Sequence, residues 1–262
     1  IEQVFKAGGA QAIAAMAYGT PSIPKCDKLF GPGNAFVTAA KMLVAQDPEG
    51  AAADLPAGVT EVMVIADHSS RADFIAADLL AQAEHGADAQ SLLVTTSTAL
   101  AEEVARQIPL QAERLSRSEI LAKSIPHMRL LIVDDLDAAF DIANAYAPEH
   151  LLIQVQEPRR WLRKVRAAGA VFLGPWSPES VGDYCSGPNH TLPTYGYAKA
   201  HSGLSLEDFQ KRITVQELTR AGLEELGPTT QILADLEGLD AHAASVTLRL
   251  AAIRSDSPGM AP

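Results

Sequence analysis

Apolar runs typical of strands alternate with helical patterns through the centre of the chain, and this alternation constrains the fold most. Residues 61–66 are an almost continuous apolar run, and a helical pattern follows over residues 72–84. Later strands are predicted at residues 91–95, 129–133, 151–155 and 170–173, with helices at 99–123, 136–146 and 159–167. Apolar strands that alternate with helices predict an α/β fold whose parallel sheet is covered on both faces. In such a doubly wound, Rossmann-like sheet we expect functional residues at the carboxyl ends of the strands.

The flanking segments predict a smaller part on each side. Helical spacing runs from Ile1 to Gly19, a short strand is expected at residues 26–30, and a helix at 35–46. We interpret residues 1–59 as a partial, incomplete α/β domain on the cofactor side and residues 60–204 as the α/β domain that holds the site. No strand pattern follows Ser205, so residues 205–262 are expected to form an all-helical C-terminal tail, with a long helix over residues 228–253.

Charge and cysteine content narrow the class of partner. The net charge is -11, which disfavours nucleic acid and anionic membranes because both require a basic face. Two cysteines are too few for a disulfide framework, and no apolar run reaches 18 residues. We therefore expect a cytoplasmic protein whose partner is a small molecule. The chain begins inside an amphipathic pattern without a cap or a Met, so we also expect that an N-terminal part is absent.

Residues 182–196 predict a functional loop. This segment places an acid, a thiol, an amide and an imidazole between Gly and Pro residues that interrupt helices and strands. Such loops carry sites because a rigid scaffold can position them. The alternative is a surface turn in which Asp183 and Asn189 bond to their own backbone.

Four side chains suggest a metal site. Gln82 and His85 lie three residues apart at the end of a predicted helix, so their side chains point the same way. Together with Asp183 and His242 they provide two imidazoles and two oxygen donors, a set that suits zinc. The alternative for His85 is a core histidine that the helix dipole stabilises.

Glu149 and His150 are candidates for proton transfer. Histidine exchanges protons near neutral pH, and a neighbouring carboxylate can activate water. The alternative is a solvated glutamate beside a half-buried histidine.

Residues 31–34, Gly-Pro-Gly-Asn, precede a helix and suit either a cofactor phosphate or an ordinary turn.

Taken together, these motifs resemble the histidinol dehydrogenase family. The matching stretches occur in the family's order over nearly the whole chain: residues 7–14, 31–34, 81–86, 147–151, 182–196 and 237–242. Members of this family carry a further N-terminal region, which agrees with the expected missing start.

The resemblance implies roles for individual residues. It implies zinc ligation by Gln82, His85 and Asp183, with His242 contributed by the partner subunit of a homodimer. Glu149 and His150 match the catalytic pair. Residues matching substrate contacts are Thr60, Gln82, His85, His150, Asp183, His190, Glu237 and His242, whereas Gln11 and Asn34 match contacts to the NAD cofactor. Thr60 stands where the family has serine.

The activity that the resemblance implies is the zinc-dependent, NAD-linked oxidation of L-histidinol to L-histidine through a bound aldehyde. This is the last step of histidine biosynthesis. Three alternatives stay open: a dehydrogenase of another small polar alcohol, a zinc hydrolase that uses water near Glu149, and a truncated chain without activity.

Overall fold

A sheet of five parallel strands forms the centre of the computed structural model, which describes residues 1–256 except the side chain of Asp256. The strand order is β5-β4-β3-β6-β7. The strands are β3 (Glu61–Ala66), β4 (Gln90–Thr95), β5 (Arg129–Ile132), β6 (His150–Gln154) and β7 (Ala170–Leu173). The five strands predicted for this sheet are confirmed, with ends that differ by at most one residue. The chain winds outward from β3 to β5 and then resumes on the other side at β6, so the sheet is doubly wound.

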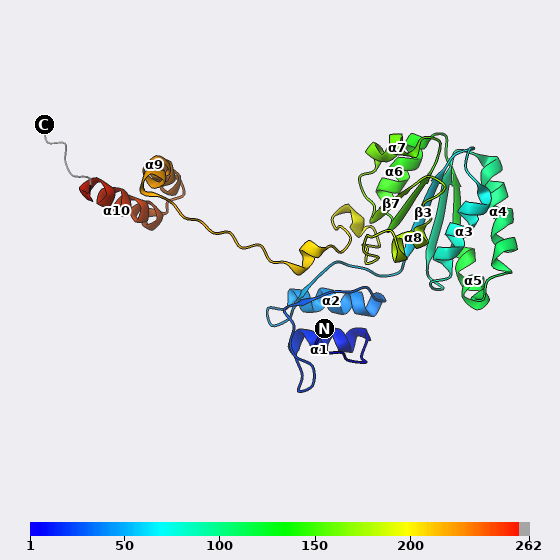
Figure 1. Cartoon of the computed structure of the whole chain (residues 1–262), viewed down its shortest axis with the longest axis horizontal. Helices are drawn as coiled ribbons and strands as arrows, with labels where there is room; N and C mark the ends of the chain where they lie inside the picture. The colour runs from blue at the N-terminus through cyan, green and yellow to red at the C-terminus, as the bar shows by residue number, and fades with distance from the viewer. Residues whose placement is uncertain (257–262) are drawn as a thin grey trace. The chain divides into compact units, whose positions relative to one another are not determined.

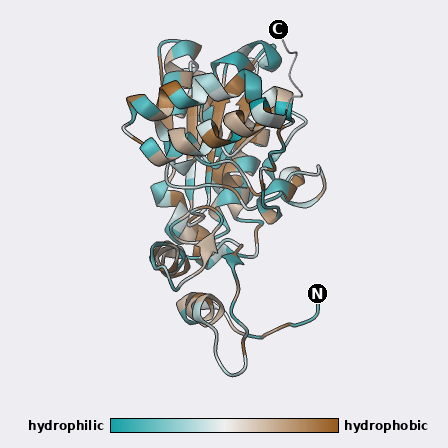
Figure 2. Ribbon diagram, turned by 90° about the vertical axis from the view of Figure 1, so that its left-hand side faces the viewer, coloured by the Kyte–Doolittle hydropathy of each residue, from teal (hydrophilic) through white to brown (hydrophobic). Residues whose placement is uncertain are grey.

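Helices cover both faces of this sheet (Figure 1). On one face lie α3 (Ala72–Ala83), α4 (Thr98–Ala112) and α5 (Ser118–Ser124). On the other lie α6 (Leu136–Tyr146) and α7 (Pro158–Trp161). Side chains of β3 alternate between the two cores: Val62 and Val64 pack toward α3, and Met63 and Ile65 toward α6. The apolar colour of the strands between more polar helices in Figure 2 follows from this two-sided burial, and the predicted α/β fold is confirmed.

The prediction of one continuous helix over residues 99–123 is wrong. The segment is divided into α4 and α5, with turns between them. The division lets α5 turn back toward the sheet, where Leu121 is buried in the core. Ser124 Oγ then donates a hydrogen bond to the Ala83 carbonyl at the end of α3, at 2.8 Å.

The helix predicted over residues 159–167 is also shorter than expected. The helix consists of α7 alone, and a 3₁₀ turn, η2 (Leu162–Lys164), follows it. Asn144 Oδ1 accepts hydrogen bonds from the backbone N–H groups of Arg166 (2.7 Å) and Ala167 (3.3 Å), and these bonds replace the helical ones.

The first sixty residues form two helices and a small parallel sheet. The helices are α1 (Gly9–Tyr18) and α2 (Ala35–Gln46), and the strands are β1 (Lys28–Leu29) and β2 (Ala52–Ala53). The prediction of a helix from Ile1 is wrong, because residues 1–8 contain no regular secondary structure. The reason is the glycine pair, in which Gly8 is extended and Gly9 has a φ of 77°.

A buried ion pair fixes the loop between β1 and α2. Lys41 on α2 pairs with Asp54, and both side chains are almost completely buried. Lys41 Nζ also donates to the carbonyl of Gly31 at 2.8 Å, while Asp54 Oδ2 accepts from the Gly31 N–H at 2.8 Å. The predicted turn at residues 31–34 is therefore held from both sides.

A capped turn precedes the second compact unit. Ser205 and Asp208 form a capping box at the start of a 3₁₀ turn, η4 (Leu206–Phe209). Phe209 of this turn stacks on Phe30, with ring centroids 4.1 Å apart. The chain forms one compact unit up to Gln210 and a second from Lys211. The division into residues 1–59, 60–204 and 205–262 stays a prediction.

The second unit contains α9 (Arg220–Leu236) and α10 (Asp240–Asp256). The continuous helix predicted over residues 228–253 is wrong, because the break falls at Gly238, whose φ is 69°. Gly227 does not end a helix. It lies inside α9, where a Cβ atom would meet the side chain of Leu250 at 2.9 Å, so it allows α9 and α10 to pack closely. Within residues 1–256, no helix combines the length and hydropathy that a membrane span requires.

Candidate active site

The candidate residues gather at the amino ends of β3 and β6, the two strands where the winding direction changes. Val62 pairs with His150 in the register of these strands, which brings Thr60 and Glu61 beside Glu149 and His150. The expectation of a site at the carboxyl ends of the strands is therefore wrong. The physical reason is that α3 runs antiparallel to the strands, so its end, with Gln82 and His85, returns to their amino ends.

His150 is buried, with 3% of its surface exposed, and its ring is oriented by a backbone group. Its Nδ1 lies 3.1 Å from the carbonyl oxygen of Glu61. A carbonyl can only accept, so Nδ1 carries the hydrogen in this contact. The Nε2 atom has no hydrogen-bond partner among the described residues and lies 3.7 Å from Asp183 Oδ1. This arrangement leaves Nε2 available for proton exchange.

Glu149 is held through one carboxylate oxygen. Its Oε2 accepts hydrogen bonds from the Thr60 hydroxyl at 2.7 Å and from the Glu61 N–H at 2.9 Å. Its backbone carbonyl accepts from the N–H of Ala170, at the start of β7, at 2.8 Å. Glu149 Oε2 lies 3.6 Å from His150 Nδ1, so the two adjacent side chains share one site. Neither residue is solvated, which excludes the alternative of an exposed glutamate beside a half-buried histidine.

Burial and nearby charges act in opposite directions on the pKa of each residue of the pair. Burial raises the pKa of Glu149, although the nearby His150 and two hydrogen bonds offset part of the effect. Burial would lower the pKa of His150, but the carboxylates of Asp183, Glu179 and Glu149 outweigh it and raise this pKa to about 9. The imidazole thus lies in a strongly negative environment.

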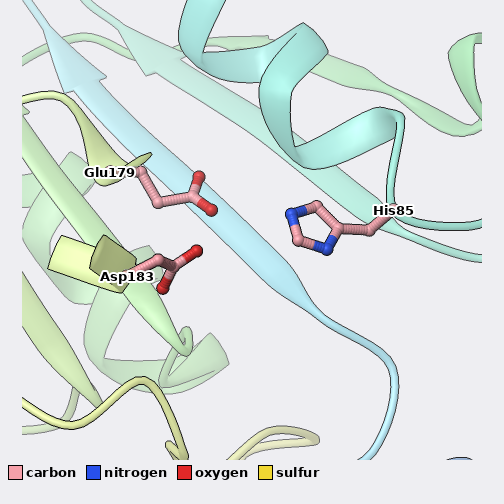
Figure 3. Close-up of side chains that lie close together, drawn as sticks. All are labelled: His85, Glu179 and Asp183. Atoms are coloured by element: carbon pink, nitrogen blue, oxygen red, sulfur yellow. The ribbon is translucent and has the colours of Figure 1, made fainter. Parts of the chain in front are cut away.

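Three side chains converge beside His150 as a possible metal site. His85, Glu179 and Asp183 each offer one ligand atom, and these atoms lie within 4.8 Å of one another. Figure 3 shows both carboxylates turned toward the imidazole of His85. Asp183 and Glu179 come from α8 (Glu179–Tyr184), and His85 follows α3.

Gln82 supports the same assignment. It is completely buried, and neither atom of its amide group has a hydrogen-bond partner among the described residues. Burying an amide without partners is costly, so the oxygen of Gln82 is suited to bind a cation. The donor types of Gln82, His85 and Asp183 are oxygen and imidazole nitrogen, which zinc accepts.

Sequence reasoning missed Glu179 as a member of this cluster. The functional loop was expected to begin at Gly182, but residues 182–184 complete α8, and only the following residues are irregular. A helix over these residues places Glu179 and Asp183 four positions apart on one face. That spacing was the available signal.

The other predicted residues are distributed more widely. His190 is exposed, but it lies close enough to contribute to the lowered pKa of Asp183, after the stronger effect of His150. Asn34 Oδ1 caps α2 by accepting from the N–H groups of Phe36 and Val37, both at 3.1 Å. Gln11 is exposed on α1. His242 and Glu237 are exposed and belong to the second unit.

The chain is similar to curated proteins named histidinol dehydrogenase. The family model described as histidinol dehydrogenase matches residues 1–250. The protein of that name from Xanthomonas campestris pv. campestris (strain 8004) is 57% identical over 251 residues, and that from Vibrio vulnificus (strain YJ016) is 54% identical over 250 residues. Each alignment covers 95% of this chain and 58% of the relative.

A solved structure agrees with these relatives. The crystal structure of histidinol dehydrogenase from Elizabethkingia anophelis superposes with a TM-score of 0.92 at 46% identity. The match covers 97% of this chain and 58% of that one, so the chain spans somewhat more than half the length of the relatives that it matches. By its sequence and its fold alike, the chain belongs to the histidinol dehydrogenase family.

Proposed function

We propose that the protein oxidises L-histidinol to L-histidine in two successive hydride transfers to NAD, with zinc in the site and L-histidinaldehyde bound between the two steps. The observation that carries the proposal is the buried His150, whose Nδ1 is fixed by the Glu61 carbonyl while Nε2 has no hydrogen-bond partner among the described residues. A general base needs this combination of orientation and a free nitrogen.

Gln82, His85 and Asp183 would hold the zinc ion, together with His242 of the partner subunit. When bound, zinc would orient the imidazole and amine of the substrate and offset the carboxylate charge around His150, and NAD would accept the hydride. Support within this chain comes from the unpartnered amide of Gln82 and from the convergence of His85 with Asp183.

His150 would take the hydroxyl proton of the alcohol at Nε2. Glu149 would then accept a proton from the water that adds to the aldehyde, so that the hydrate can be oxidised to the carboxylate. The hydrogen bonds from Thr60 and the Glu61 N–H hold Oε2 of Glu149, and this leaves Oε1 for the water. Burial of both residues keeps bulk water away from the proton transfers.

The remaining assignments are part of the same proposal. Thr60, His190 and Glu237 would contact the substrate, and Gln11 and Asn34 the NAD cofactor. A homodimer with shared sites would explain why the second unit carries His242 and Glu237. We propose the cytoplasm as its location.

NADH formation from L-histidinol and NAD, with zinc present, tests the proposal on this chain and on His150→Asn. The proposal expects two NADH per histidinol and a rate that falls roughly 10²–10⁴-fold in the variant. If this chain is inactive, the same assay on a chain extended at its N-terminus decides. No turnover there either would contradict the proposal, and turnover of other small alcohols alone would point to a different substrate.

A further inference from the structure

Glu61, the first residue of β3, carries a buried side chain that has no role in the proposed mechanism. The residue is 2% exposed, and its Oε1 accepts a hydrogen bond from the N–H of Tyr195 at 2.9 Å. Its Oε2 is buried and has no hydrogen-bond partner among the described residues. Burial raises the pKa of Glu61 to about 7, although the bond from Tyr195 offsets part of this increase. Burying a carboxylate is costly, which indicates that its bond to Tyr195 serves a role in the site.

Tyr195 lies at the end of an irregular loop, residues 185–196, that follows α8. Its φ of 54° is in the left-handed region, which is uncommon for a residue other than glycine and persists only where the surroundings hold it. A second bond holds the same turn, because the Gly58 N–H donates to Thr194 Oγ1 at 2.8 Å. The ring of Tyr195 also packs on Gly58, where a Cβ atom would clash with its Cε2 atom. The end of the loop is therefore anchored to the segment that leads into β3.

The main chain of Glu61 contacts the catalytic pair at the same time. Its N–H donates to Glu149 Oε2 at 2.9 Å, and its carbonyl oxygen accepts from His150 Nδ1 at 3.1 Å. One residue thus connects the loop to the pair. The loop carries His190, which lies close enough to Asp183 to contribute to the lowered pKa of that residue, after the stronger effect of His150.

We propose that Glu61 is a positioning residue for the oxidation of histidinol: its carboxylate fixes the end of the loop and so keeps His190 at the substrate. This inference rests on the proposed function, in which His190 contacts the substrate. Oε1 is occupied by the Tyr195 N–H and Oε2 is buried, so the side chain of Glu61 does not itself take a proton from the substrate.

A positioning role has a distinct kinetic signature. Without the anchor, the loop leaves the site in a fraction of the molecules, and the apparent affinity for histidinol falls by that fraction. KM for histidinol then rises. At saturating histidinol kcat changes little, because the bonds from the main chain of Glu61 to Glu149 and His150 do not depend on its side chain.

Hydrogen exchange and steady-state kinetics test the inference on the full chain, or on the N-terminally extended chain if only that one is active. Glu61→Leu removes the acceptor, whereas Glu61→Gln retains an oxygen that accepts the Tyr195 N–H. Thr194→Val removes the other anchor of the turn without a change at Glu61. The control is Asp78→Asn, which neutralises a buried carboxylate that bonds elsewhere.

We expect Glu61→Leu to accelerate hydrogen exchange of residues 185–196 roughly 10–100-fold and to raise KM for histidinol about 10-fold, because a hydrogen bond to a charged group contributes this much to an equilibrium. Thr194→Val is expected to act in the same direction by less. Glu61→Gln and Asp78→Asn are expected to stay within a few-fold of the unsubstituted protein in both properties. His150→Asn is expected to show the opposite pattern, with a reduced kcat and unchanged exchange of the loop.

Unchanged exchange in Glu61→Leu overturns the anchor, and faster exchange with an unchanged KM overturns the positioning role. A fall in kcat alone overturns it as well, because it would place Glu61 in the chemical step. If Glu61→Leu does not fold, Glu61→Met replaces it, since this flexible side chain fills irregular spaces without an oxygen acceptor. If the unsubstituted protein, extended or not, does not oxidise histidinol, the proposed function itself fails, so the two failures are distinguishable.

Discussion

The hydroxyl group of Thr60 donates a hydrogen bond to Oε2 of Glu149 across 2.7 Å, although the two residues lie 89 positions apart. The same oxygen accepts the Glu61 N–H, so two neighbouring groups on the approach to β3 hold one carboxylate. The hydroxyl that resembles a substrate contact by sequence therefore also positions Glu149.

Replacing Thr60 by Val keeps the shape of the side chain but removes this donor. Hydrogen bonds to charged groups contribute about 1.5–3 kcal/mol, so we expect kcat for histidine formation to fall roughly 10–100-fold. Thr60→Ser retains the hydroxyl and is expected to stay within a few-fold of the parent. Equal rates for the Val and Ser variants would contradict the role of the hydrogen bond.

Glu149 and His150 are expected to affect different half-reactions. His150→Asn is expected to slow oxidation of both histidinol and the aldehyde, roughly 10²–10⁴-fold, because both need a proton acceptor. Glu149→Gln is expected to slow aldehyde oxidation more, because only that step consumes water. Initial rates with each substrate check the difference, and Glu157→Gln, an exposed glutamate, is the control. Equal losses in both half-reactions of Glu149→Gln would exclude the separate roles.

Asp78 makes stability depend on pH. Burial raises its pKa from 3.8 to about 6, although a hydrogen bond from Gln154 at 2.7 Å offsets part of this increase. Because the folded-state pKa lies above the unfolded value, the folded state binds more protons, and stability falls as pH rises from about 4 to about 6.

Asp78→Asn removes this charge, so it is expected to raise the unfolding temperature at pH 8, with a gain of at most about 3 kcal/mol. The gain is expected to disappear near pH 4, as thermal unfolding at both pH values will show. Asp141→Asn, at an exposed position, is the control. A gain that is the same at both pH values would refute the assignment.

Breaking the ion pair of Lys41 and Asp54 is expected to destabilise the region around α2. Asp54→Asn leaves the buried Lys41 without its counter-charge, at a cost of about 3–5 kcal/mol. Hydrogen exchange of residues 35–46 is expected to accelerate accordingly. The exposed Asp27→Asn provides the comparison. Replacement of both partners, Lys41 by Met and Asp54 by Leu, is expected to recover much of the lost stability. If Asp54→Asn does not change the hydrogen exchange of residues 35–46, the ion pair does not stabilise this region.

Local patterns predicted the sheet strands well and the helix ends less well. The strands of residues 61–66 and 170–173 were predicted without error, because their length and apolar runs are local properties. Helix continuity was not predictable at Gly227 and Gly238. Both are glycines within helical patterns, and only the packing of Leu250 against Gly227 distinguishes close approach from a break.

The sequence by itself determined the α/β class and the family, because strand periodicity and short motifs are properties of neighbouring residues. It also predicted Glu149 and His150 as an acid-base pair. Only the tertiary structure decided that the site lies at the amino ends of the strands, that Nδ1 of His150 faces the Glu61 carbonyl, and that Glu179 joins His85 and Asp183. These relations depend on the parallel register of β3 and β6 and on the return of α3 and α8 to the same edge. They bring together residues that lie about ninety positions apart in the sequence, and a pattern of neighbouring residues cannot predict such a contact.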